Sequence, residues 1–167
     1  MIKAQNLVAG QWQDNLEAST FCTLNPITNK PLTTQFQEAS SSQIHDSLIK
    51  ASTIFESYAS TSFKVRIEFL QSIQKELNKS SNEILKTYQE ESALPRPRAE
   101  GEFQRTIDQI QRYIELLDEG TFIQPKINTS GPDLRKILYP IGPIAVFGAS
   151  NFPLAFSTAG GDTISVL

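Results

Sequence analysis

The stretch PIAVFGASNFPLAF, residues 143–156, limits what this chain can fold into more than any other feature. Its first six residues form a short apolar run, which is typical of a strand buried on both faces. A small-residue turn follows, and Phe152-Pro153 then begins a segment expected to be helical. A strand, a turn and a helix open a βαβ unit, whose parallel sheet needs further strands. Few residues remain before Leu167, so the expected fold class is α/β with a sheet that these residues begin and do not complete.

Residues 43–118 have the periodicity of amphipathic helices. Apolar side chains recur at intervals of three and four residues, which predicts that one face of each helix packs into a core. The cluster Ser40-Ser41-Ser42 supplies an N-cap for the first helical segment, Ser62 precedes the second, and Gly120 is placed to end the last one. The expected core positions are Ile44, Leu48, Ala51, Ile54, Phe55, Tyr58, Val65, Phe69, Leu70, Ile73, Leu77, Ile84, Leu85, Tyr88, Phe103, Ile107, Ile110, Ile114 and Leu117.

Residues 1–40 have the pattern of short strands and turns. The segment NLVAGQWQD contains two short runs around Ala9-Gly10, which predicts a hairpin. FCTLNPITNKPL follows with several Asn and Pro turn residues, and TTQF is expected to be another strand. After the helices, TFIQPKINTSGPD is expected to be a linker or loop, and LRKILYP an extended run.

The composition narrows the possible partners and compartments. The formal net charge is −3, so the chain lacks the basic excess that neutralises phosphates, and no nucleic-acid partner is expected. No apolar run reaches membrane-spanning length and the first residues lack the pattern of a secretory signal, so no membrane partner is expected and cytoplasmic residence is the default. The single cysteine, Cys22, excludes an internal disulfide and a multi-cysteine metal site, and no metal is expected.

The turn after the apolar run is the first candidate site. Ligands of open α/β sheets bind where strands end and helices begin, because backbone N–H groups and the helix dipole point there. Gly148, Ala149 and Ser150 are small enough for a ligand to lie against the backbone, and Asn151 can donate its side-chain amide to an oxyanion. Local chemistry alone favours an N-cap role for Asn151. The G-x-G-x-x-G fingerprint is absent, so a standard Rossmann phosphate loop is not predicted.

Other chemically reactive residues have simpler interpretations. Cys22 lies in an expected strand without a nucleophile motif, and is interpreted as a small buried or half-buried hydrophobe. His45 is expected at the surface near a helix start. The pair Glu100 and Glu102 is expected on a solvated or charge-paired face. The neighbouring arginines of RPRAEGEFQR either bind an anion or pair with those glutamates, and pairing is favoured.

Residues 138–163, LYPIGPIAVFGASNFPLAFSTAGGDT, resemble the start of the cofactor-binding domain of aldehyde dehydrogenases, where a strand leads to a turn and an N-F-P motif. The sequence FGASNFPLAFS is similar to that of the α-ketoglutarate semialdehyde dehydrogenase subgroup. Common members of the family instead have a proline and a tryptophan just before the asparagine. AGQWQD with NPITNKPL resembles the family's N-terminal hairpin, and ESALPRPRAEGEFQRTIDQI resembles the subgroup's helix entrance. The likeness covers nearly the whole chain.

The resemblance implies roles for five residues. Asn151 matches the asparagine whose side chain helps to stabilise the oxyanion of the thiohemiacetal intermediate. Phe147, Gly148, Ala149 and Ser150 match the strand-end and turn positions beside the nicotinamide and its ribose. The family's nucleophilic cysteine, its general-base glutamate and the lysine that contacts the adenosine ribose have no counterpart in this sequence, and are expected beyond its last residue.

The implied reaction is NAD- or NADP-dependent oxidation of an aldehyde to a carboxylate, with 2,5-dioxopentanoate giving 2-oxoglutarate. The resemblance implies that residues 1–167 are the N-terminal part of the NAD(P)-binding domain, without the catalytic domain. Its parts are β hairpins over 1–40, helices over 43–118, an oligomerisation arm over 133–140, and the first strand–turn–helix of the nucleotide-binding sheet over 143–167.

Two expectations follow for the chain and its parent. The chain alone is expected to be inactive, and the complete enzyme is expected to be a homo-oligomer, either a dimer or a tetramer. The alternative is a stand-alone, non-catalytic helical interaction or assembly module left from a disrupted dehydrogenase gene.

Overall fold

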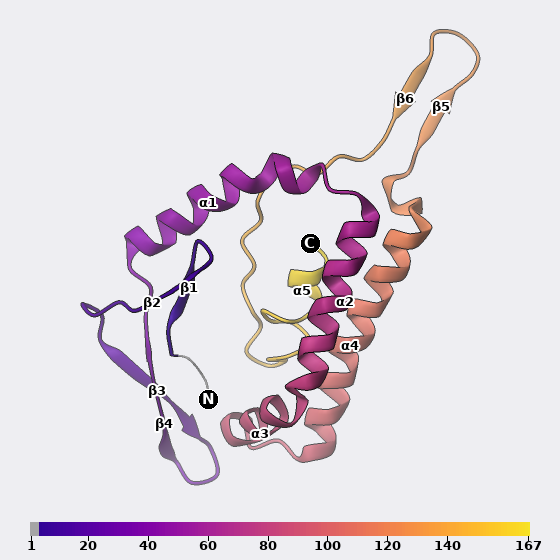
Figure 1. The fold of residues 1–167 in the computed structure, drawn as a ribbon. Helices are drawn as coiled ribbons and strands as arrows, with labels where there is room; N and C mark the ends of the chain where they lie inside the picture. The colour runs from indigo at the N-terminus through magenta and orange to yellow at the C-terminus, as the bar shows by residue number, and fades with distance from the viewer. Residues whose placement is uncertain (1–3) are drawn as a thin grey trace.

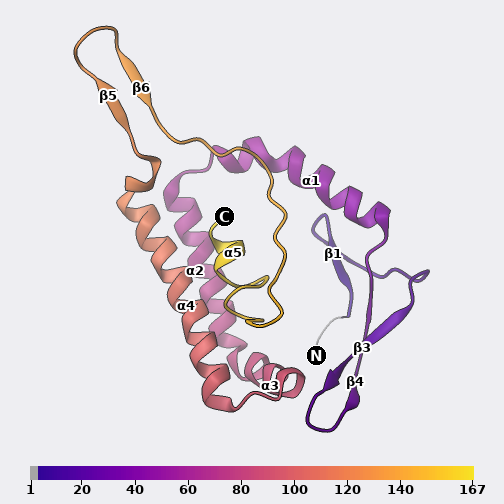
Figure 2. The same cartoon turned by 180° about the vertical axis from the view of Figure 1, so that it is seen from behind.

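The computed structural model describes residues 4–167. Helices α2 and α4 lie side by side, α3 crosses one end of the pair, and the β5–β6 hairpin projects from the other end (Figures 1 and 2). No helix in this described part is long and apolar enough to cross a membrane. The elements are β1 (Asn6–Val8), β2 (Gln11–Gln13), β3 (Thr20–Asn25), β4 (Lys30–Gln37), α1 (Ser41–Ala59), α2 (Phe63–Lys79), α3 (Ser81–Ser92), α4 (Arg96–Glu119), η1 (Thr121–Ile123), β5 (Lys126–Asn128), β6 (Leu134–Lys136) and α5 (Gly161–Ile164).

The described strands pair as three antiparallel hairpins. In β1–β2, Val8 lies opposite Gln11, and the two turn residues between them have left-handed backbones, with φ of 51° at Ala9 and 87° at Gly10. Such a turn matches the twist of its flanking strands, which confirms the predicted hairpin. Strands β3 and β4 also pair antiparallel, with a register irregularity between Cys22 and Leu24, and Cys22 is half-buried, as its sequence context predicted.

The helix boundaries follow the predicted caps. The Ser40 hydroxyl accepts the backbone N–H of Gln43 at 3.1 Å, and the Gln43 side chain accepts the Ser40 N–H at 3.0 Å. This reciprocal capping box satisfies two N–H groups that a helix start otherwise leaves unpaired. Ser62 caps α2 in the simpler way, and Gly120, with φ of 67°, ends α4.

The core lies along one face of α4. Two clusters share this face: one joins α4 to α3, and the other joins α4 to α2 and α5. The apolar stripe predicted for α4 is therefore confirmed. Buried members of the first cluster are Leu85, Tyr88, Ala99, Phe103 and Ile107, and those of the second are Leu70, Ile110, Ile114 and Ile164.

The core prediction is wrong for two residues of α2, Val65 and Phe69, which are 50% and 44% exposed, and for most of α1. On α1, Phe55 and Tyr58 are half-buried, but Ile44, Leu48 and Ile54 have exposed fractions of 53%, 57% and 43%. Helix α1 runs away from the α2–α4 pair, so no described helix covers this stripe (Figure 1). Gln43, in the capping box, is the buried residue of α1.

The last thirty residues depart furthest from the prediction. The segment 143–149 is extended but forms no strand, because no described strand lies beside it to complete a hydrogen-bond ladder. Its apolar side chains are exposed, among them Phe147 at 88%. The helix predicted after Phe152-Pro153 is also wrong: residues 150–159 form successive turns, and helix α5 covers only Gly161–Ile164.

The predicted linker after α4 is more ordered than expected. It contains the single turn η1 and strand β5, which pairs with β6 so that Lys126 lies opposite Lys136. The extended conformation predicted for LRKILYP is confirmed for the part that forms β6.

Candidate functional site

A groove of about 770 Å³ separates α3 from the turn that follows Ala149. Ser150 and Asn151 line one side of it, and both residues are exposed. The structure therefore brings two of the five predicted site residues to one concave surface. The lining residues are Ser80, Glu83, Ile84, Thr87, Tyr88, Glu91, Ser92, Leu94, Ser150, Asn151, Pro153 and Leu154.

The other three predicted residues lie at the entry to the turn. The Ala149 N–H donates to the Phe156 carbonyl at 2.7 Å, which closes residues 149–156 into a loop. Gly148 lies so close to Ser157 that a Cβ on it would be 2.6 Å from the Ser157 hydroxyl oxygen. Phe147 is almost fully exposed and does not line the groove. Gly148 and Ala149 thus shape the loop.

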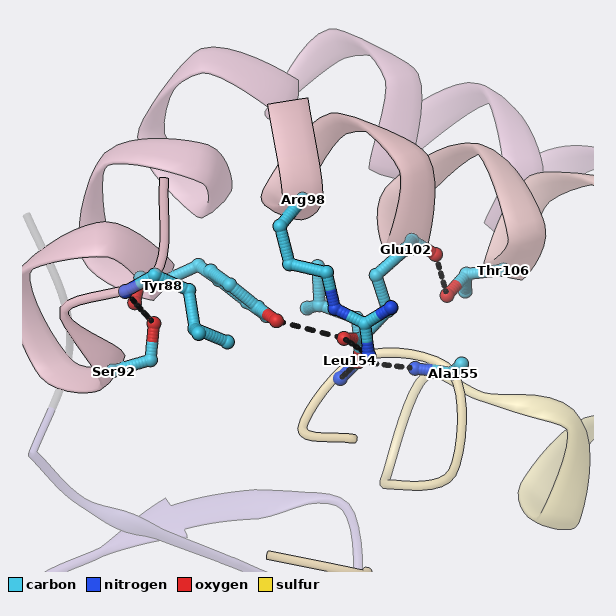
Figure 3. Close-up of polar contacts among 8 residues, drawn as sticks. Tyr88, Ser92, Arg98, Glu102, Thr106, Leu154 and Ala155 are labelled. Carbon is cyan, nitrogen blue, oxygen red and sulfur yellow. Dashed lines mark hydrogen bonds and ion pairs between the residues drawn. The ribbon is translucent and has the colours of Figure 1, made fainter. Parts of the chain in front are cut away.

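The carboxylate of Glu102 holds this loop against α4 (Figure 3). One of its oxygens accepts the backbone N–H groups of Leu154 at 2.9 Å and Ala155 at 3.2 Å. The other accepts the Tyr88 hydroxyl at 2.8 Å and lies 3.8 Å from an Arg98 nitrogen. Glu102 has an exposed fraction of only 3%, and burial of a carboxylate is tolerated where several donors surround it.

The buried position of Glu102 rules out the solvated face that was one of the two alternatives, and its ion pair with Arg98 at 3.8 Å bears out the other, charge pairing. Its shorter contacts are to neutral donors, which the sequence did not predict. A signal for its burial was present in the sequence. Ala99, Phe103, Thr106 and Ile110 recur at helical spacing, and Glu102 lies beside Phe103 on the same buried face of α4. A carboxylate on an apolar helix face predicts a buried polar contact, although the loop N–H groups that it binds, at sequence separations of 52 and 53, are not encoded locally.

The same network affects the Tyr88 side chain. Burial, the hydrogen bond to Glu102 and the negative charge of Glu102 raise the pKa of the Tyr88 hydroxyl above its ordinary value of 10.0, while Arg98 lowers it in part. Tyr88 therefore remains a neutral donor to Glu102 at physiological pH. This hydroxyl connects α3, one wall of the groove, to the loop that forms the other wall.

The arginines near the start of α4 have different partners. Arg96 donates to Glu100 at 2.7 Å, which confirms the predicted pairing for this residue. The Arg98 guanidinium lies 4.8 Å from the centre of the Phe152 ring, and that of Arg105 lies 4.7 Å from the centre of the Phe156 ring. These cation–π contacts place two positive charges on the loop that carries Asn151.

Among residues 4–167, no group of three His, Cys, Asp or Glu side chains is arranged to hold a metal ion. His45 is exposed near the start of α1, as predicted.

Comparison with known proteins identifies the family of this chain. Residues 12–160 match the family model described as "Aldehyde dehydrogenase family". The chain belongs to the aldehyde dehydrogenase family. This confirms the resemblance drawn from the N-F-P segment and the N-terminal hairpin motifs.

Relatives from bacteria cover most of this aldehyde dehydrogenase family chain. The alpha-ketoglutaric semialdehyde dehydrogenase of Acinetobacter baylyi is 35% identical over 158 residues, which is 90% of this chain and 30% of that protein. The alpha-ketoglutaric semialdehyde dehydrogenase 2 of Azospirillum brasilense is 32% identical, again over 90% of this chain and 30% of its own length. The chain thus spans about a third of the length of the curated relatives it matches.

Solved structures match the fold. Aldehyde dehydrogenase 21 from Physcomitrella patens, in complex with the reaction product succinate, superposes with a TM-score of 0.76 at 26% identity, covering 91% of this chain and 32% of that one. Proline utilization A from Bdellovibrio bacteriovorus reaches a TM-score of 0.81 at 18% identity, which supports the fold alone, over 95% of this chain and 16% of that one. The predicted mixed helix and strand architecture of aldehyde dehydrogenases is confirmed at this partial coverage.

Proposed function

We propose that this chain supplies the oxyanion-binding asparagine and part of the nicotinamide-binding turn of an NAD- or NADP-dependent aldehyde dehydrogenase. The observation that carries the proposal is Asn151, exposed on the wall of a groove within a chain of this family. When a thiolate adds to an aldehyde, the carbonyl oxygen becomes negatively charged. An amide N–H aimed at that oxygen stabilises the charge as it develops, which lowers the barrier.

The thiolate for this reaction is not expected from Cys22. This is the one cysteine of the sequence, it lies on β3, and it is not among the residues that line the groove. We therefore propose that polypeptide outside residues 1–167 supplies the nucleophile and the general base. The chain alone is expected to produce no NADH or NADPH from any aldehyde.

The turn fits one part of a nicotinamide dinucleotide. Gly148 and Ser150 are exposed and carry small side chains or none, so a flat ring can approach the backbone between them. The N–H of Ala149 is already bonded to Phe156, which leaves the side chains of Ser150 and Asn151 as the polar groups of this surface. When bound, the dinucleotide supplies the hydride acceptor. The role of this chain is to orient it, and Ser150 is the residue proposed to contact the ribose.

The proposed substrate is 2,5-dioxopentanoate, with 2-oxoglutarate as product. Its support comes from relatives: two are named alpha-ketoglutaric semialdehyde dehydrogenases, and a third, 28% identical, is an N-succinylglutamate 5-semialdehyde dehydrogenase of Pseudomonas fluorescens. All three names describe aldehydes that also carry carboxylates. An aldehyde with a negatively charged group a few carbons away is therefore the substrate class proposed here.

A chimeric enzyme provides the direct test. Residues of this chain replace the matching 158-residue segment of the Acinetobacter baylyi dehydrogenase, and formation of NADH and NADPH from 2,5-dioxopentanoate is measured by absorbance. The chimera is expected to be active. Asn151→Ala is expected to lower kcat by about 10²–10³-fold, the usual effect of removing one oxyanion donor.

Asn78→Ala is the matched control, since Asn78 is an exposed asparagine on α2 that bonds only within its own helix, to the Gln74 carbonyl at 2.9 Å. It is expected to leave kcat within twofold of the parent chimera. A folded chimera that retains its kcat after Asn151→Ala would contradict the proposal. An inactive but folded chimera would favour the alternative, a non-catalytic interaction module.

Self-association of the complete enzyme is proposed to use the β5–β6 hairpin and the residues that follow, including the predicted arm over 133–140. The hairpin projects away from the helices, and Ile127 and Leu134 on it are 65% and 59% exposed (Figure 2). Exposed apolar strands commonly pair with a second chain. Replacing both residues with Lys in the chimera is expected to shift its sedimentation from a dimer or tetramer to a monomer.

A further inference from the structure

We propose that Glu102 is a positioning residue for the oxyanion step, because it holds the loop that carries the Asn151 amide. This inference rests on the function proposed above and extends it to a residue that is not among those lining the groove. The Glu102 carboxylate is only 3% exposed, and it is bonded to the backbone that follows Asn151 (Figure 3).

The loop between Asn151 and the bonded backbone is short and closed on itself. Leu154, whose N–H donates to the carboxylate, comes only three residues after Asn151. The Phe156 N–H donates to the Phe152 carbonyl at 3.1 Å, and the Ala149 N–H donates to the Phe156 carbonyl at 2.7 Å. These bonds join the loop into one unit. A shift of the backbone at Leu154 is therefore passed on to Asn151, since three residues between bonded groups leave little slack.

The other polar contacts between this loop and α4 are weaker. The guanidinium of Arg98 lies 4.8 Å from the centre of the Phe152 ring. That of Arg105 lies 4.7 Å from the centre of the Phe156 ring. Both arginines are exposed, and cation–π contacts at exposed sites are weak. Hydrogen bonds to a buried carboxylate are charge-assisted and act at low dielectric, so loss of the carboxylate is expected to release the loop.

Tyr88 fixes the orientation of the Glu102 carboxylate. Its hydroxyl donates to one oxygen at 2.8 Å, and the other oxygen accepts the N–H groups of Leu154 and Ala155 at 2.9 and 3.2 Å. Rotation of the carboxylate would break contacts on both sides. The loop therefore requires an acceptor oxygen at one fixed place. A glutamine can supply it with weaker bonds, because its amide oxygen accepts the two N–H groups and its NH₂ can donate to the tyrosine oxygen.

A double-mutant cycle in the chimera tests the assignment. Glu102→Ala is expected to lower kcat by about 10–10²-fold, the scale for a catalytic group misplaced by about 1 Å, and to leave KM within about threefold. In a chimera that already carries Asn151→Ala, the same change is expected to lower kcat by less than about threefold, because the donor that Glu102 positions is gone. A merely structural role would lower kcat by the same factor in both backgrounds.

Two variants and a control complete the cycle. Glu102→Gln keeps the acceptor and is expected to retain kcat within about threefold of the parent chimera. Glu102→Asp keeps the charge but withdraws it by one carbon, and is expected to lower kcat about tenfold. It replaces Glu102→Ala in the cycle if that variant does not fold, as judged by circular dichroism. Glu100→Ala removes an exposed glutamate of α4 that pairs with Arg96, and is expected to leave kcat within about twofold.

A measurement on the 167-residue chain follows the loop without catalysis. Backbone ¹⁵N relaxation gives order parameters for the amides of Asn151 and Phe152. They are expected to stay near about 0.85 in the parent and in Glu100→Ala, and to fall below about 0.6 in Glu102→Ala or its Asp replacement.

Equal factors in the two backgrounds, a Glu102→Gln chimera as slow as Glu102→Ala, or an ordered loop in Glu102→Ala would overturn the assignment. The two proposals fail in different ways. If Asn151→Ala leaves kcat unchanged, the proposed function fails and this inference fails with it. If Asn151→Ala lowers kcat and the two factors simply multiply, only the role of Glu102 fails.

Discussion

Replacing Glu102 with Ala is expected to detach the Asn151 loop from α4 and to destabilise the whole chain. The carboxylate is almost fully buried and accepts three hydrogen bonds, from the backbone of Leu154 and Ala155 and from the Tyr88 hydroxyl, at 2.8–3.2 Å. Alanine accepts none of them, so a buried N–H and a buried hydroxyl lose their partner. Unpaired buried polar groups are costly because water cannot replace the lost contact.

The size of the effect follows from these contacts. A hydrogen bond to a charged group contributes about 1.5–3 kcal/mol, and the partly buried Leu154 N–H regains some solvation in the variant. Glu102→Ala is therefore expected to lower the free energy of unfolding by about 3–5 kcal/mol. Glu102→Gln keeps one acceptor oxygen and is expected to lower it by about 1–2 kcal/mol.

Two measurements check this expectation. Urea unfolding followed by far-UV circular dichroism gives the free energy of unfolding, and native-state hydrogen exchange gives the local opening at the Ala155 amide. In Glu102→Gln, the Ala155 amide is expected to exchange about tenfold faster, whereas Ile110, deep in the core of α4, changes only with global stability.

Glu100→Gln is the matched control, because Glu100 lies half a turn away on α4 and forms an exposed pair with Arg96. It is expected to change stability by less than about 1 kcal/mol, as exposed ion pairs usually do. Equal destabilisation by the Glu100 and Glu102 variants, or unchanged exchange at Ala155, would refute the role assigned to Glu102.

Three further predictions address the backbone, the pH response and the exposed surface. Gly160→Ala makes a Cβ clash with the Ala155 carbonyl oxygen and is expected to cost about 2 kcal/mol or more of stability. Gly101→Ala, with open space around it inside α4, is expected to gain about 0.5–1 kcal/mol, and urea midpoints measure both. Because the pKa of Tyr88 is raised in the folded chain, its contribution to stability is present below pH 10.0 and is lost as the pH rises through the folded pKa, so Tyr88→Phe is expected to flatten the fall in urea midpoint at high pH. The chain is expected to self-associate through the exposed apolar segment 143–149, in which Phe147 is 88% exposed. Phe147→Asp is expected to shift its size-exclusion elution toward the monomer, and an unchanged profile would contradict this role of Phe147.

Local sequence patterns predicted much of the helical layer. Ser40, Ser62 and Gly120 mark helix ends because caps act within one turn, and the stripe on α4 is buried because α2, α3 and α5 lie against it. The stripe on α1 has the same periodicity and is exposed. Periodicity therefore identifies which face of a helix can be buried, and the presence of a covering element decides whether it is.

The strand predicted over 143–148 failed for a related reason. An apolar run indicates that both faces of a segment are suited to burial. A strand forms, however, only when a neighbouring strand pairs with its backbone N–H and C=O groups. The described residues provide none, so the backbone is extended and its side chains are exposed. The candidate residues were found in the sequence through the motif beside this run, and not through the secondary structure predicted for it.

The position of Asn151 therefore depends on the helices and not on a sheet. In the described residues no strand ladder fixes the segment before it, whereas the residues after it are held by Glu102, at sequence separations of 52 and 53. Glu102 is itself oriented by Tyr88 from α3, which forms the opposite wall of the groove. One buried carboxylate thus sets the distance between the two walls. Displacement of α3 from α4 is expected to move Asn151 as well, so stability of the helical layer and geometry of the site are coupled.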